Sequence, residues 1–187
     1  MTDKVVLITG STDGIGRQAA LELAALGATV LVHGRDAARG RNVVEEIRTA
    51  TGNQKVDLFI ADLSSLQQTR QLAADITNHC SALHVLINNA GVFMNERQLT
   101  VDGLETTFAV NHLAPFLLTN LLLDLLKKSA PSRIITVSSV AHTRGNLDFD
   151  NLQAEKSFGG YSSYALSKLA NVLFAYELGE LLAGTGI

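Results

Sequence analysis

The sequence predicts an α/β fold in which helices cover both faces of one doubly wound parallel sheet, giving three layers, α/β/α. Two observations predict it. Short apolar runs alternate with helix-like patterns five times along the chain, an order typical of parallel sheets built from βα units. The first run, residues 5–8, is continuously apolar, as expected of a strand that is buried on both faces. A closed barrel would need eight such units, so five units favour an open sheet.

The expected elements follow one another without a long linker. We expect strands at residues 5–8, 28–33, 56–61, 83–87 and 133–137, and helices at residues 15–26, 37–49, 62–79, 101–128 and 161–182. Gly27 is the expected end of the first helix, because glycine readily adopts the left-handed conformation found there. Asp62 and Ser64 are the expected caps of the third helix. A polar loop is expected at residues 141–160.

The composition indicates one domain spanning residues 1–187 and no second domain. The formal net charge of −3 excludes nucleic-acid binding that depends on bulk positive charge. The single cysteine excludes a disulfide framework and a cysteine-based zinc site, and it suits a reducing compartment. No run of about 18 apolar residues occurs, and the first strand begins too early for a targeting peptide. We therefore expect a cytoplasmic protein without a membrane segment.

A glycine-rich turn joins the first strand to the first helix. Residues 9–16 read TGSTDGIG and lie where an α/β fold binds the pyrophosphate of a dinucleotide. We expect Gly10 to allow the sharp turn, Gly14 the approach of backbone to phosphate, and Gly16 close packing of helix against strand. The other cofactor-binding candidates of this turn are Ser11, Thr12 and Ile15. The turn lacks the lysine of a P-loop, and a tight turn without a ligand is the alternative.

The end of the second strand bears on the choice of dinucleotide. An acidic residue there would bind the ribose of NAD, whereas an arginine would accommodate the 2′-phosphate of NADP. The chain has Gly34 followed by Arg35, and Arg17 beyond the glycine turn could add a second cation. We therefore expect NADP(H) to be preferred over NAD(H). The alternative is that Arg35 is a solvated residue paired with Asp36.

A tyrosine and a lysine share one face of the last predicted helix. Tyr164 and Lys168 are four residues apart, a spacing that brings side chains together on a helix. A free phenol has a pKa near 10, and a neighbouring cation favours the phenolate and lowers that value. Ser138 and Ser139 end the fifth predicted strand, where ligands bind in open α/β sheets. Either serine could donate a hydrogen bond to a reacting carbonyl.

Together these residues resemble the short-chain dehydrogenase/reductase family along nearly the whole chain. The glycine turn resembles that family's TGxxxGIG, residues 88–91 read as its NNAG, and Asp62-Leu63 resembles the acidic pair that contacts adenine. The resemblance implies further cofactor-binding residues: Asp62, Leu63, Asn89, Ala90, Gly91, Tyr164 and Lys168. It assigns catalysis to Asn111, Ser139, Tyr164 and Lys168.

The resemblance implies an oxidoreductase that transfers hydride between a nicotinamide and a carbonyl or alcohol carbon. Tyr164 would exchange the proton, and Lys168 would lower the pKa of Tyr164 and hold the nicotinamide ribose. Ser139 would orient and polarise the substrate oxygen, with Ser138 in a supporting role. Asn111 would anchor a water that leads protons to Lys168.

The retinol-dehydrogenase-like branch of the family is resembled by three segments, residues 108–113, 138–142 and 167–171. The 25-residue step from Ser139 to Tyr164 is also longer than is common in the family, which again resembles this branch. That branch mostly uses NADP(H), and the resemblance implies a small, hydrophobic substrate.

The chain departs from the family at its carboxyl end. In the family a sixth strand, a mobile substrate loop and a seventh strand follow the position of residues 184–187. We therefore expect a sheet that is incomplete at the carboxyl end. Two functions stay open: an NADP(H)-dependent oxidoreductase, or a non-catalytic dinucleotide-binding or interaction module.

The other candidates have simpler explanations. Tyr161 lies seven residues before Lys168, about two turns away, and is less well placed than Tyr164 to act as the proton donor. His79, Cys80 and His84 lack a sensible ligand spacing, so no metal site is expected. The leucine-rich stripe at residues 121–126 is most simply helix core. In the family it often forms a dimer face, which favours a homo-oligomer.

Overall fold

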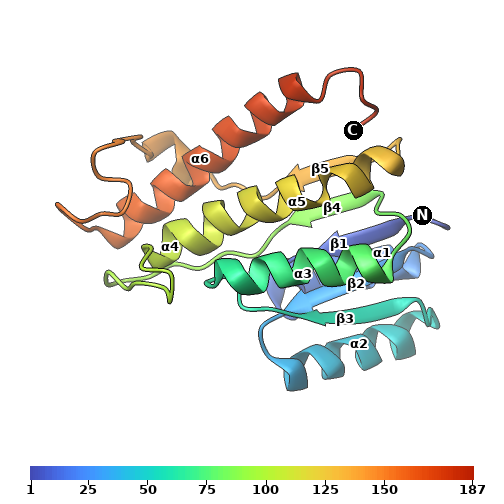
Figure 1. The fold of residues 1–187 in the computed structure, drawn as a ribbon. Coiled ribbons are helices and arrows are strands. Elements are labelled where there is room, and N and C mark those ends of the chain that lie inside the picture. Colours follow the sequence, from blue (N-terminus) through green and yellow to red (C-terminus); the bar gives the residue numbers. More distant parts are fainter.

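The computed structural model describes all 187 residues and contains one parallel sheet with helices on both faces (Figure 1). The strands are β1 Val5–Ile8, β2 Thr29–Gly34, β3 Val56–Ile60, β4 Val85–Asn88 and β5 Arg133–Thr136. The helices are α1 Gly14–Ala25, α2 Ala37–Thr51, α3 Leu66–His79, α4 Thr106–Phe108, α5 Ala114–Lys128 and α6 Gly160–Leu181. The strand order β3-β2-β1-β4-β5 reverses between β1 and β4, which confirms the doubly wound sheet.

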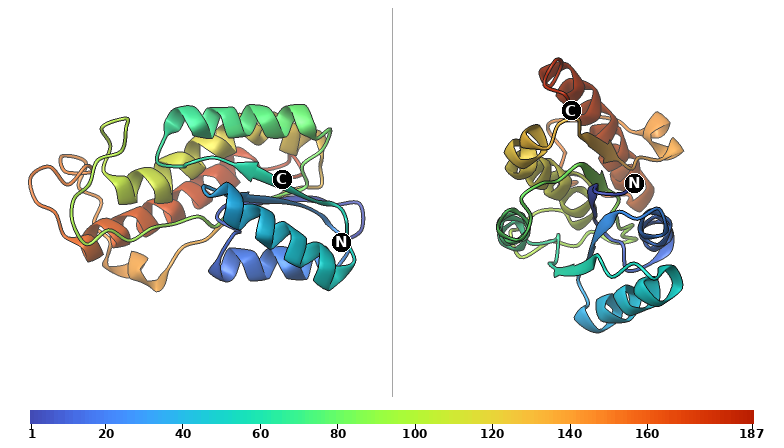
Figure 2. Two further views of the ribbon diagram at one scale, coloured as in Figure 1. Left: turned by 90° about the horizontal axis from the view of Figure 1, so that it is seen from below. Right: turned by 90° about the vertical axis from the view of Figure 1, so that its right-hand side faces the viewer.

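Alternate residues of each strand face opposite layers, which explains the continuous apolar runs in the sequence. Leu7 and Leu31 belong to a buried cluster with residues of α3 and α5. Val6 and Val30, which are paired in register between β1 and β2, belong to a second cluster with residues of α1 and α2. Figure 2 shows these two pairs of helices on opposite sides of the sheet. Both faces of the strands are therefore removed from water.

The long helix expected at residues 101–128 begins later and is interrupted. The helical segment starts only at α4, and a π-helical turn, Ala109–Leu113, joins α4 to α5. The buried carboxylate of Glu105 accepts hydrogen bonds from the N–H groups of Thr107 and Phe108, both at 2.8 Å, and so caps α4. The apolar period continues across residues 101–104, so the pattern alone predicted too early a start.

Two further boundaries differ in detail from the sequence prediction. Ser65, rather than Asp62 or Ser64, caps α3, because Ser65 Oγ accepts the N–H of Gln68 at 3.3 Å. Asp62 closes the preceding turn instead, with Oδ1 2.9 Å from the N–H of Ser64. The polar loop that was expected at residues 141–160 opens with a short 3₁₀ helix, Val140–Arg144.

One helical segment is apolar enough to be compared with a membrane span. By length and composition alone, Thr106–Lys128 could cross a bilayer. However, 56% of its most apolar 18-residue window is buried inside the fold, and a helix in the core of a folded domain has the same composition. The segment is therefore only weak support for a membrane span.

Candidate active site

The candidate residues gather at the carboxyl edge of the sheet, around the point where the strand order reverses. Each of the five strands ends in a segment that the sequence singled out: the glycine turn after β1, Arg35 after β2, Asp62 after β3, residues 89–91 after β4 and Ser139 after β5. This crevice is where open α/β sheets bind ligands. Tyr164 and Lys168 reach it from α6, and Asn111 reaches it from the π-helical turn.

The glycine turn has a backbone that suits glycine at each of the three positions. Gly10 and Gly14 have φ of +63° and +52°, a region that other residues rarely adopt. A Cβ atom at Gly16 would collide with the Asn89 side chain and lie 2.5 Å from the Gly10 carbonyl oxygen. At Gly14, by contrast, a Cβ would meet nothing within 4 Å. The space beside Gly14 is therefore open, while the Gly14 N–H itself donates to Asp13 Oδ1 at 2.8 Å, so that Asp13 caps α1.

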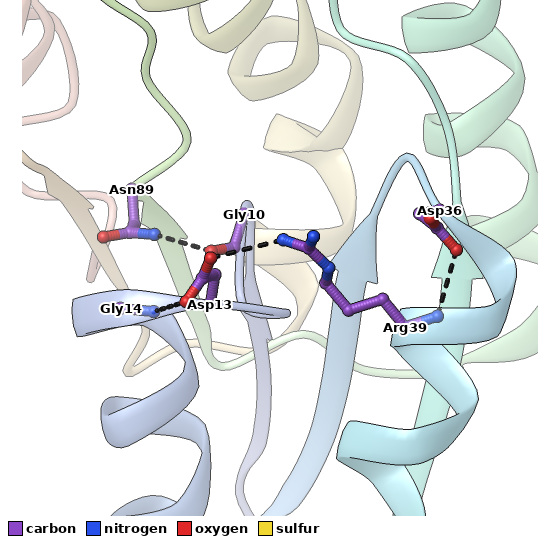
Figure 3. Close-up of polar contacts among 6 residues, drawn as sticks. All are labelled: Gly10, Asp13, Gly14, Asp36, Arg39 and Asn89. Carbon is purple, nitrogen blue, oxygen red and sulfur yellow. Dashed lines mark hydrogen bonds and ion pairs between the residues drawn. The ribbon is translucent and has the colours of Figure 1, made fainter.

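Asn89 fixes the glycine turn to the end of β4. Its Nδ2 donates to the carbonyl oxygens of Thr9 (2.8 Å) and Gly10 (3.2 Å), and Figure 3 shows the second contact. The backbone N–H groups of Asn89 and Ala90 both donate to Thr9 Oγ1 at 3.0 Å. The amide of Asn89 is thus engaged in shaping the turn. Thr9 accepts three of these four hydrogen bonds, although the sequence did not single it out as a separate candidate.

His33 fixes the same turn to the end of β2, and sequence reasoning missed it. Its Nδ1 accepts the N–H of Gly10 at 3.1 Å. Its backbone N–H donates to Ser11 Oγ at 2.9 Å, and its carbonyl accepts the N–H of Ser11 at 2.9 Å. The side chain is 3% exposed, and this burial lowers the pKa of His33 to about 4. The ring is therefore neutral at pH 7, as an acceptor at Nδ1 requires.

The end of β2 has no room for an acidic side chain. A Cβ at Gly34 would lie 2.5 Å from Cγ2 and 2.7 Å from Oγ1 of Thr12, so the glycine turn itself occupies that space. Arg35 is exposed and makes no ion pair, not even with Asp36. Arg17 pairs with Glu46 of α2 instead of facing the turn, so the second cation expected there is not in place.

Arg39, which the sequence analysis did not select, reaches the glycine turn in place of Arg17. Its Nη1 lies 3.2 Å from Asp13 Oδ2 (Figure 3). A signal for it existed in the sequence, because Arg39 follows Arg35 by four residues at the start of α2. The contact itself joins residues 26 positions apart, which no local pattern reveals.

Asp62 and Leu63 differ in what they offer to a ligand. The Asp62 side chain is partly exposed, and its backbone N–H donates to Gln68 Oε1 at 2.8 Å. The Leu63 side chain is buried in the core between the sheet and α3. Only the backbone of Leu63 is therefore available at this edge.

Lys168 is a buried cation beside the Tyr164 ring. It is 4% exposed, its Nζ donates to the Val137 carbonyl oxygen at 3.1 Å, and Nζ lies 5.6 Å from the centre of the Tyr164 ring. Burial lowers the pKa of the Lys168 ammonium below its ordinary value. The helical spacing thus brings together the pair predicted from the sequence. Tyr161 is 52% exposed in the first turn of α6.

The two serines after β5 have different tasks. Ser138 Oγ donates to the Lys168 carbonyl oxygen at 2.8 Å, so its proton is engaged in holding α6. Ser139 Oγ accepts the N–H of Ala141 at 3.2 Å and caps the 3₁₀ helix. This contact leaves the hydroxyl proton of Ser139 free for another acceptor.

Asn111 lies where the π-helical turn meets α6. Its side chain bonds both backbone groups of Val92, with Oδ1 2.7 Å from the nitrogen and Nδ2 2.9 Å from the oxygen. Its carbonyl oxygen accepts Asn171 Nδ2 at 2.9 Å. A Cβ at Gly91 would lie 3.4 Å from Asn111 Oδ1 and 3.5 Å from Lys168 Nζ. Gly91, Asn111 and Lys168 therefore converge. Asn171, a polar residue three positions after Lys168, was missed.

No group of three or more His, Cys, Asp or Glu side chains is arranged to hold a metal ion. His79 Nε2 lies 3.2 Å from Asp57 Oδ2. His84 Nδ1 accepts the N–H of Val5 at 3.1 Å. The histidines at these positions are therefore engaged with protein groups.

Comparisons with a family model and with curated proteins both point to one family of dehydrogenases. The family model described as short chain dehydrogenase matches residues 4–187. Human retinol dehydrogenase 11 is 50% identical over 184 residues, which cover 98% of this chain and 58% of that protein. The chain therefore spans somewhat more than half the length of this relative.

Solved structures agree with the fold. An uncharacterized protein from Mycobacterium paratuberculosis superposes with a TM-score of 0.87 at 37% identity, covering 99% of this chain and 65% of that one. A short chain dehydrogenase from Escherichia coli CFT073, complexed with NADPH, superposes with a TM-score of 0.82 at 30% identity, covering 98% and 73%.

Proposed function

Because this chain belongs to the short-chain dehydrogenase family, we propose that it transfers hydride between NADP(H) and the carbonyl or alcohol carbon of a small, hydrophobic substrate. The observation that carries the proposal is the buried Lys168 ammonium beside Tyr164, at the edge of the sheet where the glycine turn lies. A phenol held beside a buried cation is placed to exchange a proton with a bound carbonyl or alcohol, because the cation stabilises the phenolate that forms.

The residues present fit a dinucleotide. The glycine turn and the N-terminus of α1 would take the pyrophosphate, and Asp62 and the backbone at residues 89–91 would contact the adenosine half. When bound, the nicotinamide supplies the hydride. The chain's own groups supply the rest of the chemistry.

Tyr164 donates its proton to the substrate oxygen during reduction and accepts it back during oxidation. Lys168 stabilises the phenolate that forms, and its ammonium is held in place by the Val137 carbonyl. Ser139 donates its free hydroxyl proton to the same substrate oxygen and so polarises the reacting bond. Asn111 would anchor a water that leads protons to Lys168, and its carbonyl oxygen, which accepts Asn171 Nδ2, ties the π-helical turn to α6.

The preference for NADP(H) is supported by the end of β2. Thr12 fills the space that a ribose-binding carboxylate would need at position 34. Arg35 is exposed and unpaired, so it is free to bind a 2′-phosphate. The E. coli relative in complex with NADPH provides independent support.

Replacing Arg35 by Ala is expected to lower the ratio of kcat/KM for NADPH to that for NADH by about tenfold or more, since hydrogen bonds to charged groups contribute about 1.5–3 kcal/mol. Steady-state rates with both cofactors test this. Arg41→Ala, on the exposed surface of the same helical region, is the matched control. A wild-type preference for NADH would contradict the assignment.

The substrate proposal is supported by apolar groups around the reacting tyrosine. The Phe93 ring lies 5.5 Å from the Tyr164 ring, and exposed Val140 follows Ser139 directly. Retinol, the substrate named for the human relative, is itself an apolar alcohol. Exposed apolar side chains near the reacting groups favour an apolar ligand.

NADPH consumption with a panel of aldehydes tests the proposal. Long-chain and aromatic aldehydes are expected to be reduced with higher kcat/KM than short, polar aldehydes of the same reactivity. A chain that binds NADPH but reduces no member of the panel would instead be a non-catalytic dinucleotide-binding module.

A further inference from the structure

We propose that His112 and Asn171 are positioning residues for the hydride transfer proposed above: together they hold the π-helical turn in the register that directs the Asn111 side chain toward Lys168. In this proposal both residues act through Asn111 and not on the substrate. The inference rests on the proposed function and adds two residues to the machinery of that site.

A chain of hydrogen bonds connects α6 to the π-helical turn, against which it packs. Asn171 Nδ2 donates to the Asn111 carbonyl oxygen at 2.9 Å. Because that carbonyl can only accept, the oxygen of the amide, Asn171 Oδ1, faces His112 Nδ1 at a distance of 3.1 Å. An amide oxygen also only accepts, so Nδ1 of His112 carries the proton in this contact. The donor and the acceptor of each bond are therefore fixed, and a flipped amide would lose both bonds.

The π-helical turn depends on contacts from outside its own helix. It holds one residue more per hydrogen-bonded turn than an α-helix, and such turns are rare and occur frequently at functional sites. Reverting to a continuous α-helix would rotate one side of the turn against the other by about 100°, the angle between successive residues. Asn111 lies in the middle of the turn. The bond from α6 to its carbonyl oxygen therefore opposes that rotation directly at Asn111.

The register of the turn decides where the Asn111 side chain lies. Its Oδ1 accepts the N–H of Val92 at 2.7 Å, and its Nδ2 donates to Ser167 Oγ at 3.0 Å. Ser167 directly precedes Lys168, and Ser167 Oγ in turn donates to the Tyr164 carbonyl oxygen at 2.7 Å. The Asn111 side chain therefore joins the segment after β4 to the part of α6 that carries Tyr164 and Lys168. A rotated turn would break these contacts and change the surroundings of the Lys168 ammonium.

Three aromatic rings surround the His112 imidazole. The centre of the Phe108 ring lies 5.2 Å from the centre of the imidazole, and the Phe116 and Phe174 rings each lie 6.3 Å from it. Burial lowers the pKa of His112 below its ordinary value of 6.5, and the hydrogen bond with Asn171 opposes this shift only in part. The ring is therefore neutral at pH 7. Since the rings come from α4, α5 and α6, the imidazole is held between these helices with Nδ1 toward Asn171.

Substitutions at position 112 separate the hydrogen bond from the space that the side chain fills. His112→Leu and His112→Asn introduce side chains of similar size, but only Asn can donate to Asn171 Oδ1, from an Nδ2 near the place of Nδ1. With the most reactive aldehyde of the panel, kcat of His112→Leu is expected to fall by about tenfold or more, and kcat of His112→Asn to stay within about threefold of wild type. The dissociation constant of NADPH is expected to stay within about twofold of wild type in both variants.

Asn171→Leu interrupts the same chain from α6 and is expected to lower kcat as His112→Leu does. Because the two residues act as one unit, the double variant is expected to lose no more than either single variant. Displacing Asn111 also withdraws support from the Lys168 ammonium, so the apparent pKa of kcat for alcohol oxidation is expected to rise in the Leu variants, whereas a loss of folded protein alone would leave it unchanged. Asn120→Leu, at an exposed asparagine of α5, is the control and is expected to change neither kcat nor its pH profile.

Three outcomes would overturn the proposal: kcat of His112→Leu within about twofold of wild type, an equal loss of kcat in His112→Asn and His112→Leu, or an unchanged pH profile in both Leu variants. In each case wild type still reduces aldehydes, so the proposed function is unaffected. A wild-type chain that reduces no aldehyde would contradict the proposed function and this inference with it. Asn171→Leu provides a result even if His112→Leu folds poorly.

Discussion

Replacing Tyr164 by Phe is expected to lower kcat for aldehyde reduction by about 10²–10⁴-fold, the range over which a positioned general acid accelerates a reaction. The substitution removes only the hydroxyl group. The ring keeps its place beside Lys168 and Phe93, so the dissociation constant of NADPH is expected to stay within about threefold of wild type. Single-turnover rates with a reactive aldehyde and fluorescence titration of NADPH measure the two quantities separately.

Tyr161→Phe is the matched control for this substitution. Tyr161 lies on the same helix, three residues earlier, and its side chain is exposed, so its hydroxyl is expected to contribute nothing to the rate. Turnover of Tyr164→Phe within tenfold of wild type would exclude Tyr164 as the proton donor. A loss in Tyr161→Phe as large as in Tyr164→Phe would place the proton donor elsewhere on the first turns of α6.

The sequence predicted those features of the fold that depend on local periodicity. Continuous apolar runs such as residues 5–8 identified strands buried on both faces, and their alternation with helices predicted the doubly wound parallel sheet that the structure contains. The π-helical turn at Ala109–Leu113 was not predicted. A single extra residue in a helical turn hardly disturbs an apolar pattern, whereas it displaces the backbone hydrogen bonds around Asn111.

The sequence predicted those parts of the site in which the residues that meet are only a few positions apart in the chain. Tyr164 and Lys168 are an example, because four residues on a helix fix their proximity. Contacts between distant segments were not predictable in the same way. Neither the bond from Gly10 to His33 nor the pair of Asp13 with Arg39 has a local signature. Both depend on β1 and β2 lying side by side, which only the assembled sheet provides.

Acidification from about pH 7 to about pH 4 is expected to cost about 3 kcal/mol of stability through His33 alone. Burial lowers the pKa of His33 from an ordinary value of 6.5 to about 4, so the folded chain keeps the ring neutral while the unfolded chain takes up a proton. The contribution of His33 is therefore fully present above pH 6.5 and is lost progressively as the pH falls toward the folded-state pKa. The difference of about 2.5 between the two pKa values sets the size of the loss.

His33→Asn isolates this contribution from the acid response of the other groups. The side-chain oxygen of Asn can accept the Gly10 N–H near the position of Nδ1, but the residue has no titratable group in this range. Urea unfolding across the same pH range is expected to give a shallower decline for His33→Asn than for wild type. Parallel curves for wild type and His33→Asn would contradict the prediction. Protonated Nδ1 would face the N–H of Gly10, donor against donor, so the same proton that destabilises the fold also disrupts the glycine turn on which dinucleotide binding depends.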